Sequence, residues 1–192
     1  DGSSWDNATS DLRGALNAMA NATGGLKTEK EVHIKSGTYT MGNNLIVGDI
    51  AYQISMSGTD NTYVSALTVN GSYNESGIQD FGQPTVLTGS NGNNDVTLLS
   101  VATNGKPVNI SGLSFQEAKI GLNATTLGNG KLTLKNSAFR KTGEFGMKIS
   151  DAANEGALIA NTLFADGETG LNVVSGSQVK VVNATFANNN VA

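Results

Sequence analysis

Short apolar runs separated by glycine and asparagine fill the chain after about residue 30. Representative runs are EVHIK, YQIS, SALTV, VTLLSV and VNIS, which are rich in β-branched residues and too short for helices. Residues 10–22 differ, because Leu12, Leu16 and Met19 recur at helical spacing, with Ser10 or Thr9 as N-cap and a glycine pair after the last turn. The pattern predicts one amphipathic helix over about 10–22, followed by many short strands.

The second half of the chain repeats one pattern in steps of 24, 25 and 22 residues. Each copy has an asparagine or glycine at a turn position and a phenylalanine three residues later. The turn positions are Gly112, Asn136, Asn161 and Asn183, and the phenylalanines are Phe115, Phe139, Phe164 and Phe186. Aliphatic residues stand two and four places before each turn, and a further column starts with the glycines Gly121, Gly146 and Gly170. The chain therefore has an internal repeat of fixed length.

A repeat of this length with several short strands is typical of a solenoid. We predict an all-β, right-handed parallel β-helix with about 22–25 residues in each turn of the coil, or lap. Equivalent residues of neighbouring laps should then stack about 4.8 Å apart. We expect the phenylalanines to stack in the core, and the asparagines to form a buried hydrogen-bonded ladder at a corner.

Extended towards the N-terminus, the same register puts earlier turn positions at Gly37, Gly58 and Gly89. The longest of these steps contains residues 60–80, which we interpret as an excursion loop from the coil. We expect residues 1–192 to form one domain, with the helix as an N-terminal cap and laps over 30–192. Because the last residues read FANNNVA, with no capping element, we expect the N-terminal part of a longer solenoid whose open end is covered by further laps or by a partner.

Several motifs occur in an order that resembles one group of bacterial proteins. The chain begins DGSSWDNATSDLRGALNAMA, continues through EVHIKSGTYT and QPTVLTGSN, and ends in laps that contain NSAF, NTLF and NATF. This order resembles polymorphic outer-membrane proteins and autotransporter passengers, which are surface or secreted parallel β-helices. The segment NGSY departs from that group, where a glycine pair precedes the aromatic residue. The resemblance implies secretion, display at the bacterial outer membrane, and a role in adhesion and virulence.

Charge and composition exclude several classes of partner. The formal net charge is −4, and 12 Lys and Arg residues are spread thinly, which disfavours nucleic acid and anionic membrane surfaces. No apolar run is long enough to cross a bilayer, so we expect no membrane insertion within this segment. The chain has no cysteine, which excludes disulfides and thiolate chemistry.

Residues capable of catalysis or metal binding are few. His33 is the only histidine, and its strand pattern places it on an outer face. Glu144 and Glu168 lie one lap apart and could stack, Arg140 and Lys141 could contact an anionic sugar, and Asp95 is the one carboxylate of a glycine-rich loop. We interpret all of these as surface residues, and we expect no catalytic residue, no metal site and no cofactor.

The best candidate for a ligand or partner surface is the 60–80 excursion, with Tyr63, Tyr73, Asn74 and Glu75. We therefore expect a non-enzymatic, extracellular β-helix that acts as an adhesin, passenger or rigid display scaffold, with a host or neighbouring-cell protein or glycan as partner. Two alternatives remain. The chain could be a fragment of a polysaccharide lyase or glycoside hydrolase whose catalytic laps lie elsewhere, or a structural subunit of a filament or fibre.

Overall fold

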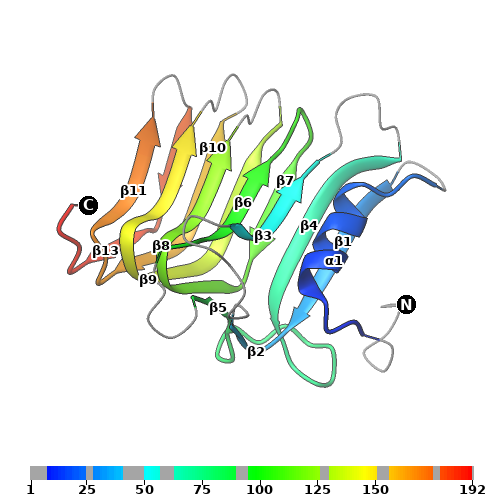
Figure 1. Cartoon of the computed structure of the whole chain (residues 1–192), viewed down its shortest axis with the longest axis horizontal. Helices are drawn as coiled ribbons and strands as arrows, with labels where there is room; N and C mark the ends of the chain where they lie inside the picture. The colour runs from blue at the N-terminus through cyan, green and yellow to red at the C-terminus, as the bar shows by residue number, and fades with distance from the viewer. Residues whose placement is uncertain are drawn as a thin grey trace.

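The computed structural model describes residues 8–24, 28–40, 50–56, 63–89, 95–125, 130–150, 156–174 and 178–191. In this part of the chain one helix, α1 (Leu12–Ala20), precedes thirteen strands that form a single curled sheet (Figure 1). The strands are β1 (Thr28–Lys35), β2 (Gly37–Thr40), β3 (Ile50–Ser55), β4 (Val64–Tyr73), β5 (Thr85–Thr88), β6 (Thr97–Ala102), β7 (Val108–Ser111), β8 (Leu113–Thr125), β9 (Leu132–Ser150), β10 (Ala157–Ala165), β11 (Thr169–Val174), β12 (Val179–Val182) and β13 (Thr185–Ala187). The fold is therefore all-β, as predicted.

Every pairing between these strands is parallel, and the pairs connect successive laps. One series runs β1–β4–β7–β9–β10–β12, a second runs β2–β5–β8–β9–β10–β13, and a third runs β3–β6–β8–β9–β11. Figure 1 shows the consequence: the colour changes steadily along the long axis, and the two chain ends lie at opposite ends of the molecule. Each lap thus contacts mainly the lap before it and the lap after it.

The predicted register is confirmed from β7 onwards. Ile110, Leu134, Ile159 and Val181 are successive strand partners, and so are Phe115, Phe139, Phe164 and Phe186. The phenylalanine rings stack with centroids 4.8, 4.9 and 4.9 Å apart and with planes within 9° of parallel. The first three rings are buried, whereas Phe186 on the last lap is 37 % exposed. The phenylalanine column therefore forms the core, as expected.

The predicted register of the earlier laps is wrong. Gly37 pairs with Thr85, and the amide of Gly89 donates to the carbonyl of Gln116, so neither glycine is equivalent to Gly112. The residue beside Gly112 on the preceding lap is Gly71. The third predicted position, Gly58, lies outside the described residues.

The interpretation of residues 60–80 as an excursion is also wrong for most of the segment. Residues 64–73 form β4, which pairs with β1 on one side and β7 on the other, in the interior of the sheet. The part that leaves the sheet is the later connection from β4 to β5, residues 74–84, which extends below the sheet in Figure 1. This connection lengthens the second lap, and it therefore displaces the glycines from the 24-residue period. Residues 60–62 lie outside the described residues.

Helix α1 is shorter than predicted and begins at a different cap. Asp11, and not Ser10 or Thr9, is the N-cap, because its Oδ1 accepts a hydrogen bond from the Gly14 amide at 2.9 Å. The C-cap is Asn21, ahead of the glycine pair.

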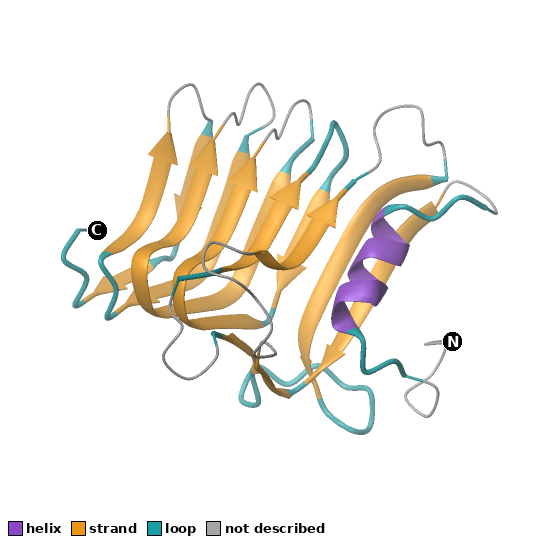
Figure 2. Cartoon of the chain, in the orientation of Figure 1, coloured by secondary structure: helices purple, strands orange, loops and turns teal. Residues whose placement is uncertain are grey.

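The helix lies against the first strands of the sheet (Figure 2). Its inner side buries Leu12, Leu16 and Ala20, which confirms two of the predicted apolar positions. The Arg13 guanidinium donates to the carbonyl oxygens of Ala51 at 2.9 Å and Ile50 at 3.2 Å, which ties the helix to β3.

The asparagine ladder is present, but it is not buried. Asn136, Asn161 and Asn183 have left-handed backbones, with φ of 49°, 50° and 52°. Asn161 Nδ2 donates to Asn136 Oδ1 at 3.2 Å, and Asn183 Nδ2 donates to Asn161 Oδ1 at 3.3 Å. Their side chains are exposed or half-buried, because the left-handed turn directs them to the outside of the corner. The amides therefore hydrogen-bond to one another along the surface.

A second corner has its own left-handed column, which the sequence did not predict. Its members are Glu117, Lys141, Asp166 and Asn188, with φ between 52° and 57°. Asn188 Nδ2 donates to Asp166 Oδ1 at 3.1 Å, and Lys141 Nζ lies 3.6 Å from Glu117 Oε1. These side chains extend the lap-to-lap contacts to a second edge of the molecule.

Candidate ligand-binding groove

Two columns of polar side chains lie side by side on the outer face of β4, β7 and the first part of β9. Side chains alternate between the two faces of a strand, so the residues between Val69, Ile110 and Leu134 point outward when those three are buried. Strand pairing then places the outward residues in register. One column contains Thr68, Asn109 and Thr133, and the other contains Asn70, Ser111 and Lys135.

These six residues, with Ile110, line a shallow hollow of about 230 Å³, which we name the polar groove. Its volume is below the roughly 300–1,000 Å³ of pockets that enclose drug-sized ligands. Five of the six polar side chains are half-buried, and only Lys135 is fully exposed. The groove is therefore suited to a small polar group lying across three strands.

Hydrogen bonds fix the orientation of several groove side chains. Asn109 Nδ2 donates to Thr68 Oγ1 at 3.3 Å, and Ser111 Oγ donates to Asn70 Oδ1 at 2.8 Å. Gln79, from the 74–84 connection, donates through Nε2 to Gly71 O at 3.0 Å and to Ser111 Oγ at 3.3 Å. Each of these bonds crosses between separate segments of the chain, so the groove is held in shape before any ligand arrives.

An aromatic pair borders the groove beside Asn70. The ring of Tyr73 stacks on His33, with centroids 4.4 Å apart and planes 12° from parallel. Burial raises the pKa of the Tyr73 hydroxyl, the charge of Glu31 raises it further, and a side-chain hydrogen bond with Asn70 acts in the opposite direction. Tyr73, one of the predicted partner-surface residues, therefore lies at the edge of the polar groove.

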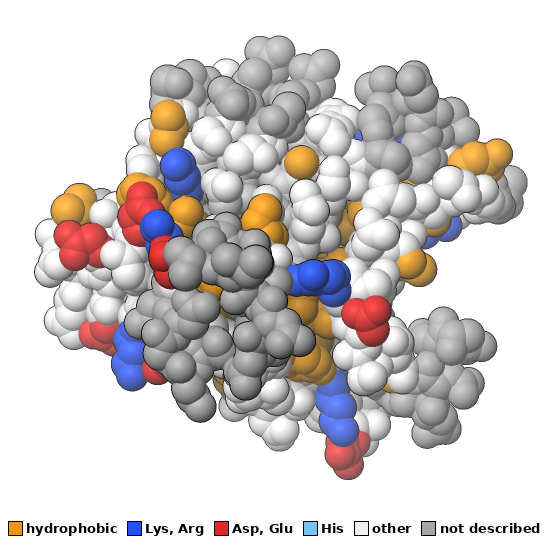
Figure 3. All heavy atoms as spheres, in the orientation of Figure 1, with side chains coloured by type: hydrophobic (Ala, Val, Ile, Leu, Met, Phe, Trp, Pro, Cys, Tyr) orange, Lys and Arg blue, Asp and Glu red, His pale blue; other side chains and the backbone are white. Residues whose placement is uncertain are grey.

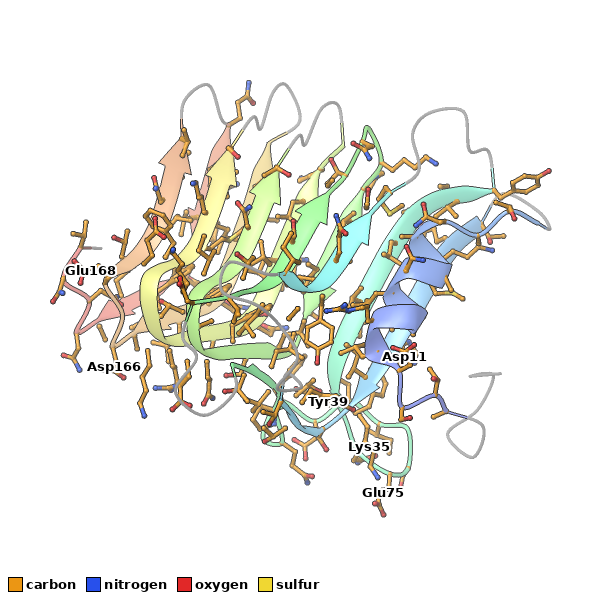
Figure 4. All side chains as sticks on the ribbon, in the orientation of Figure 1. Asp11, Lys35, Tyr39, Glu75, Asp166 and Glu168 are labelled. Atoms are coloured by element: carbon orange, nitrogen blue, oxygen red, sulfur yellow. The ribbon has the colours of Figure 1, made fainter. Side chains whose placement is uncertain are left out.

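The other predicted partner-surface residues have different surroundings. Asn74 shapes the connection after β4, since its Oδ1 accepts from the amides of Ser76 at 2.9 Å and Ile78 at 3.0 Å. Glu75 pairs with Lys35 at 2.9 Å (Figure 4), and this contact lowers the pKa of the Glu75 carboxyl.

Tyr63 is half exposed and precedes β4, so it lies at the opposite end of that strand from Tyr73, roughly 30 Å away at the usual rise per residue. The structure brings together Tyr73, Asn74 and Glu75, but it does not bring Tyr63 to them.

The candidate chemical residues are dispersed, as expected for surface positions. His33 is exposed on the outer face, where it lies 3.0 Å from Glu31. Asp166 and Glu168 lie at the C-terminal end of the sheet, away from the groove (Figure 4), and Glu168 accepts a hydrogen bond from Asn190. In the described ranges no group of three or more His, Asp or Glu side chains could hold a metal ion.

Basic side chains also lie apart from one another. Lys119 pairs with Asp95 at 2.9 Å, which raises the pKa of the lysine, and Lys141 pairs with Glu117. On the face drawn in Figure 3, Lys and Arg side chains are separated and interspersed with acidic ones. Arg140 is exposed next to Lys141. Residues 91–94, the other part of the loop that contains Asp95, lie outside the described residues.

A second hollow, of about 370 Å³, lies between α1 and β3. Asp11, Arg13, Asn17 and Gln53 contribute its polar side chains. Two of these side chains already have structural roles, because Asp11 caps the helix and Arg13 binds the β3 carbonyls. The polar groove is therefore the better candidate for a ligand site.

Comparisons with protein-family models, with curated proteins and with solved structures found no match. Among the residues that the structure describes, no helix is long and apolar enough to cross a membrane. The functional proposals below therefore depend on the geometry of this chain and on the sequence motifs.

The groove residues were not predicted as a site. Asn109, Ser111, Thr133 and Lys135 fall in laps whose register was correct, and their alternation with buried aliphatic residues was a usable signal. Thr68 and Asn70 were missed because β4 was assigned to an excursion.

Proposed function

We propose that the curled sheet is a right-handed parallel β-helix and that it acts as a non-enzymatic scaffold, secreted or exposed at the bacterial cell surface. The observation that carries this proposal is the continuous column of Phe115, Phe139, Phe164 and Phe186, stacked at 4.8–4.9 Å over four laps. A column with this spacing requires successive laps to lie parallel and in register.

Rigidity is the property that the stacked laps would supply. Backbone hydrogen bonds connect every lap to the next, and the asparagine ladder adds side-chain bonds along one corner. Inward positions are occupied by core residues, so the outward positions are available to vary without loss of the fold. This arrangement suits a rod that presents its outer faces and connections to a partner.

The location and partner follow from the sequence motifs. The resemblance of the N-terminal motifs and laps to outer-membrane and passenger β-helices supports an extracellular adhesin, with a protein or glycan of a host or neighbouring cell as partner. The net charge of −4 and the interspersed surface charges favour such a partner over nucleic acid.

Bead adhesion tests this function. Beads coated with the purified chain should adhere to cultured epithelial cells more than beads coated with an unrelated protein of similar charge, and the soluble chain should compete. Heat-unfolded chain serves as a matched control and should not compete. Adhesion no greater than that of the unrelated protein, or depolymerisation of a polysaccharide by the purified chain, would contradict the proposal.

A further inference from the structure

We infer that the polar groove binds a hydroxyl-rich glycan unit that carries one carboxylate, with Lys135 as the partner of that carboxylate. This inference rests on the proposed function, and it assigns a ligand class to one outer face of the scaffold. The observations that carry it are the chemistry of the lining, the charges at its two sides and the fixed orientation of its amides.

The lining matches the hydroxyl groups of a sugar. Thr68, Asn109, Thr133, Asn70 and Ser111 offer hydroxyl and amide groups, which both donate and accept hydrogen bonds. Such mixed groups complement sugar hydroxyls, which have the same double capacity. The apolar contribution to the lining is limited to Ile110, so an apolar ligand would leave many polar groups unpaired.

Lys135 gives the groove its sign. It is the only charged side chain in the lining, and it is exposed at the β9 side. Across the described ranges, no hydrogen bond or ion pair engages its ammonium group, whereas Lys35, Lys119 and Lys141 each pair with a carboxylate. An exposed ammonium beside neutral hydroxyls and amides can form a charge-assisted hydrogen bond with a ligand carboxylate.

The opposite side of the groove carries negative charge and therefore sets the direction of the ligand. Glu31 on β1 is the strand partner of Thr68, so a carboxylate placed there would meet a like charge. Beyond β9, the next residues in the two columns are Leu158 and Ala160, where the polar lining ends. A carboxylated sugar would therefore lie with its carboxylate towards β9 and its hydroxyls over β7 and β4.

Part of the lining is already oriented for such a ligand. The bonds from Asn109 to Thr68 and from Ser111 to Asn70 fix which atoms of these side chains face outward. Because the side chains are ordered beforehand, a ligand would lose less conformational entropy at binding. Tyr73, stacked on His33, adds an apolar ring at the edge of the groove, against which a sugar ring could pack.

Chemical-shift titration of the ¹⁵N-labelled chain tests the inference with three probes. Sialyllactose and a hyaluronan tetrasaccharide carry carboxylates from two different sugars, and lactose carries none. We expect one or both acidic probes to shift amides of β4, β7 and β9, with lactose binding at least tenfold more weakly. The acidic probe that binds identifies the type of sugar.

Lys135→Met should weaken binding of the acidic probe about tenfold or more, and Lys148→Met, which removes a lysine on β9 outside the groove, should leave it unchanged. Well-dispersed amide spectra for both variants establish that they fold. Equal affinity of Lys135→Met, equal affinity for lactose, shifts confined to other surfaces, or no shift at millimolar probe would overturn the inference. Loss of the glycan shifts with bead adhesion intact would overturn the ligand assignment alone, whereas loss of adhesion would overturn the proposed function.

Discussion

Gly121 lies directly beside the ring of Phe139 on the following lap. A Cβ atom added to Gly121 would come within 2.6 Å of Phe139 Cδ1 and within 2.6 Å of the Gly146 carbonyl oxygen. The same relationship recurs between Gly146 and Phe164, at 3.0 Å, and between Gly170 and Phe186, at 2.8 Å. The glycine column therefore provides the space in which the phenylalanine column stacks.

Gly121→Ala should destabilise the fold by about 1–3 kcal/mol, because the added methyl group overpacks the contact with Phe139 and with backbone that cannot move easily. The matched control is Gly143→Ala, whose added Cβ would meet nothing closer than the Ala118 carbonyl oxygen at 3.8 Å. That variant should stay within about 0.5 kcal/mol of the parent chain. Urea unfolding followed by circular dichroism measures both, and equal midpoints would contradict the role given to the glycine column.

Phe139→Ala should cost about 3–5 kcal/mol, because a buried ring stacked on two others is replaced by a cavity. Phe186→Ala should cost clearly less, since that ring stacks on Phe164 alone and is 37 % exposed. Thermal unfolding should therefore rank the parent chain first, Phe186→Ala second and Phe139→Ala last. The reverse order would mean that the column is not continuous.

Asn161→Leu should destabilise by roughly 1–2 kcal/mol, because leucine at φ of 50° is strained and cannot hydrogen-bond to the neighbouring laps. Asn161→Gly relieves the strain but still removes the amide bonds, so its cost should be smaller. Asn172→Leu, on β11, is the control at an asparagine outside the left-handed region. A control that costs as much as Asn161→Leu would remove the significance of the ladder.

The Tyr73 hydroxyl should titrate above the ordinary range of tyrosine, because burial and Glu31 both raise its pKa. A group with a raised folded-state pKa contributes stability that is complete below the unfolded-state pKa. That stability is lost as pH rises through the folded-state value, so the effect falls in the alkaline range. Ring-carbon NMR measures the titration directly. Glu31→Gln should lower the Tyr73 pKa towards its ordinary value, and titration of Tyr73 at or below that value in the parent chain would contradict the geometry.

How much the sequence predicts depends on whether the repeat length stays constant. Phe115 to Phe186 could be placed correctly, because steps of 22–25 residues bring identical residues onto the same column. The first laps could not, because the 74–84 connection enlarges one lap and carries no residue of the repeating pattern.

The outward columns show a second limit. Core positions repeat as aliphatic residues, so they can be recognised from one lap to the next. The outward residues Asn70, Ser111 and Lys135 differ in type, and only the strand pairing shows that they are neighbours. Similarly, Asn161 was recognised as a turn residue, but its exposure depends on a left-handed backbone that the sequence alone did not reveal.

The stacked register of the laps can be measured most directly by disulfide formation, because the parent chain contains no cysteine. Thr133 and Leu158 are outward-facing partners on β9 and β10. Their Cα atoms should lie about 4.8 Å apart, inside the range that a disulfide bridges. In the pair Thr133→Cys with Ala160→Cys, the shift of two residues separates the Cα atoms by about 8 Å, which is too far. Mild oxidation should therefore link Thr133→Cys with Leu158→Cys rapidly and the shifted pair poorly. Equal linking of the two pairs, or faster linking of the shifted pair, would contradict the stacked laps on which the proposed scaffold depends.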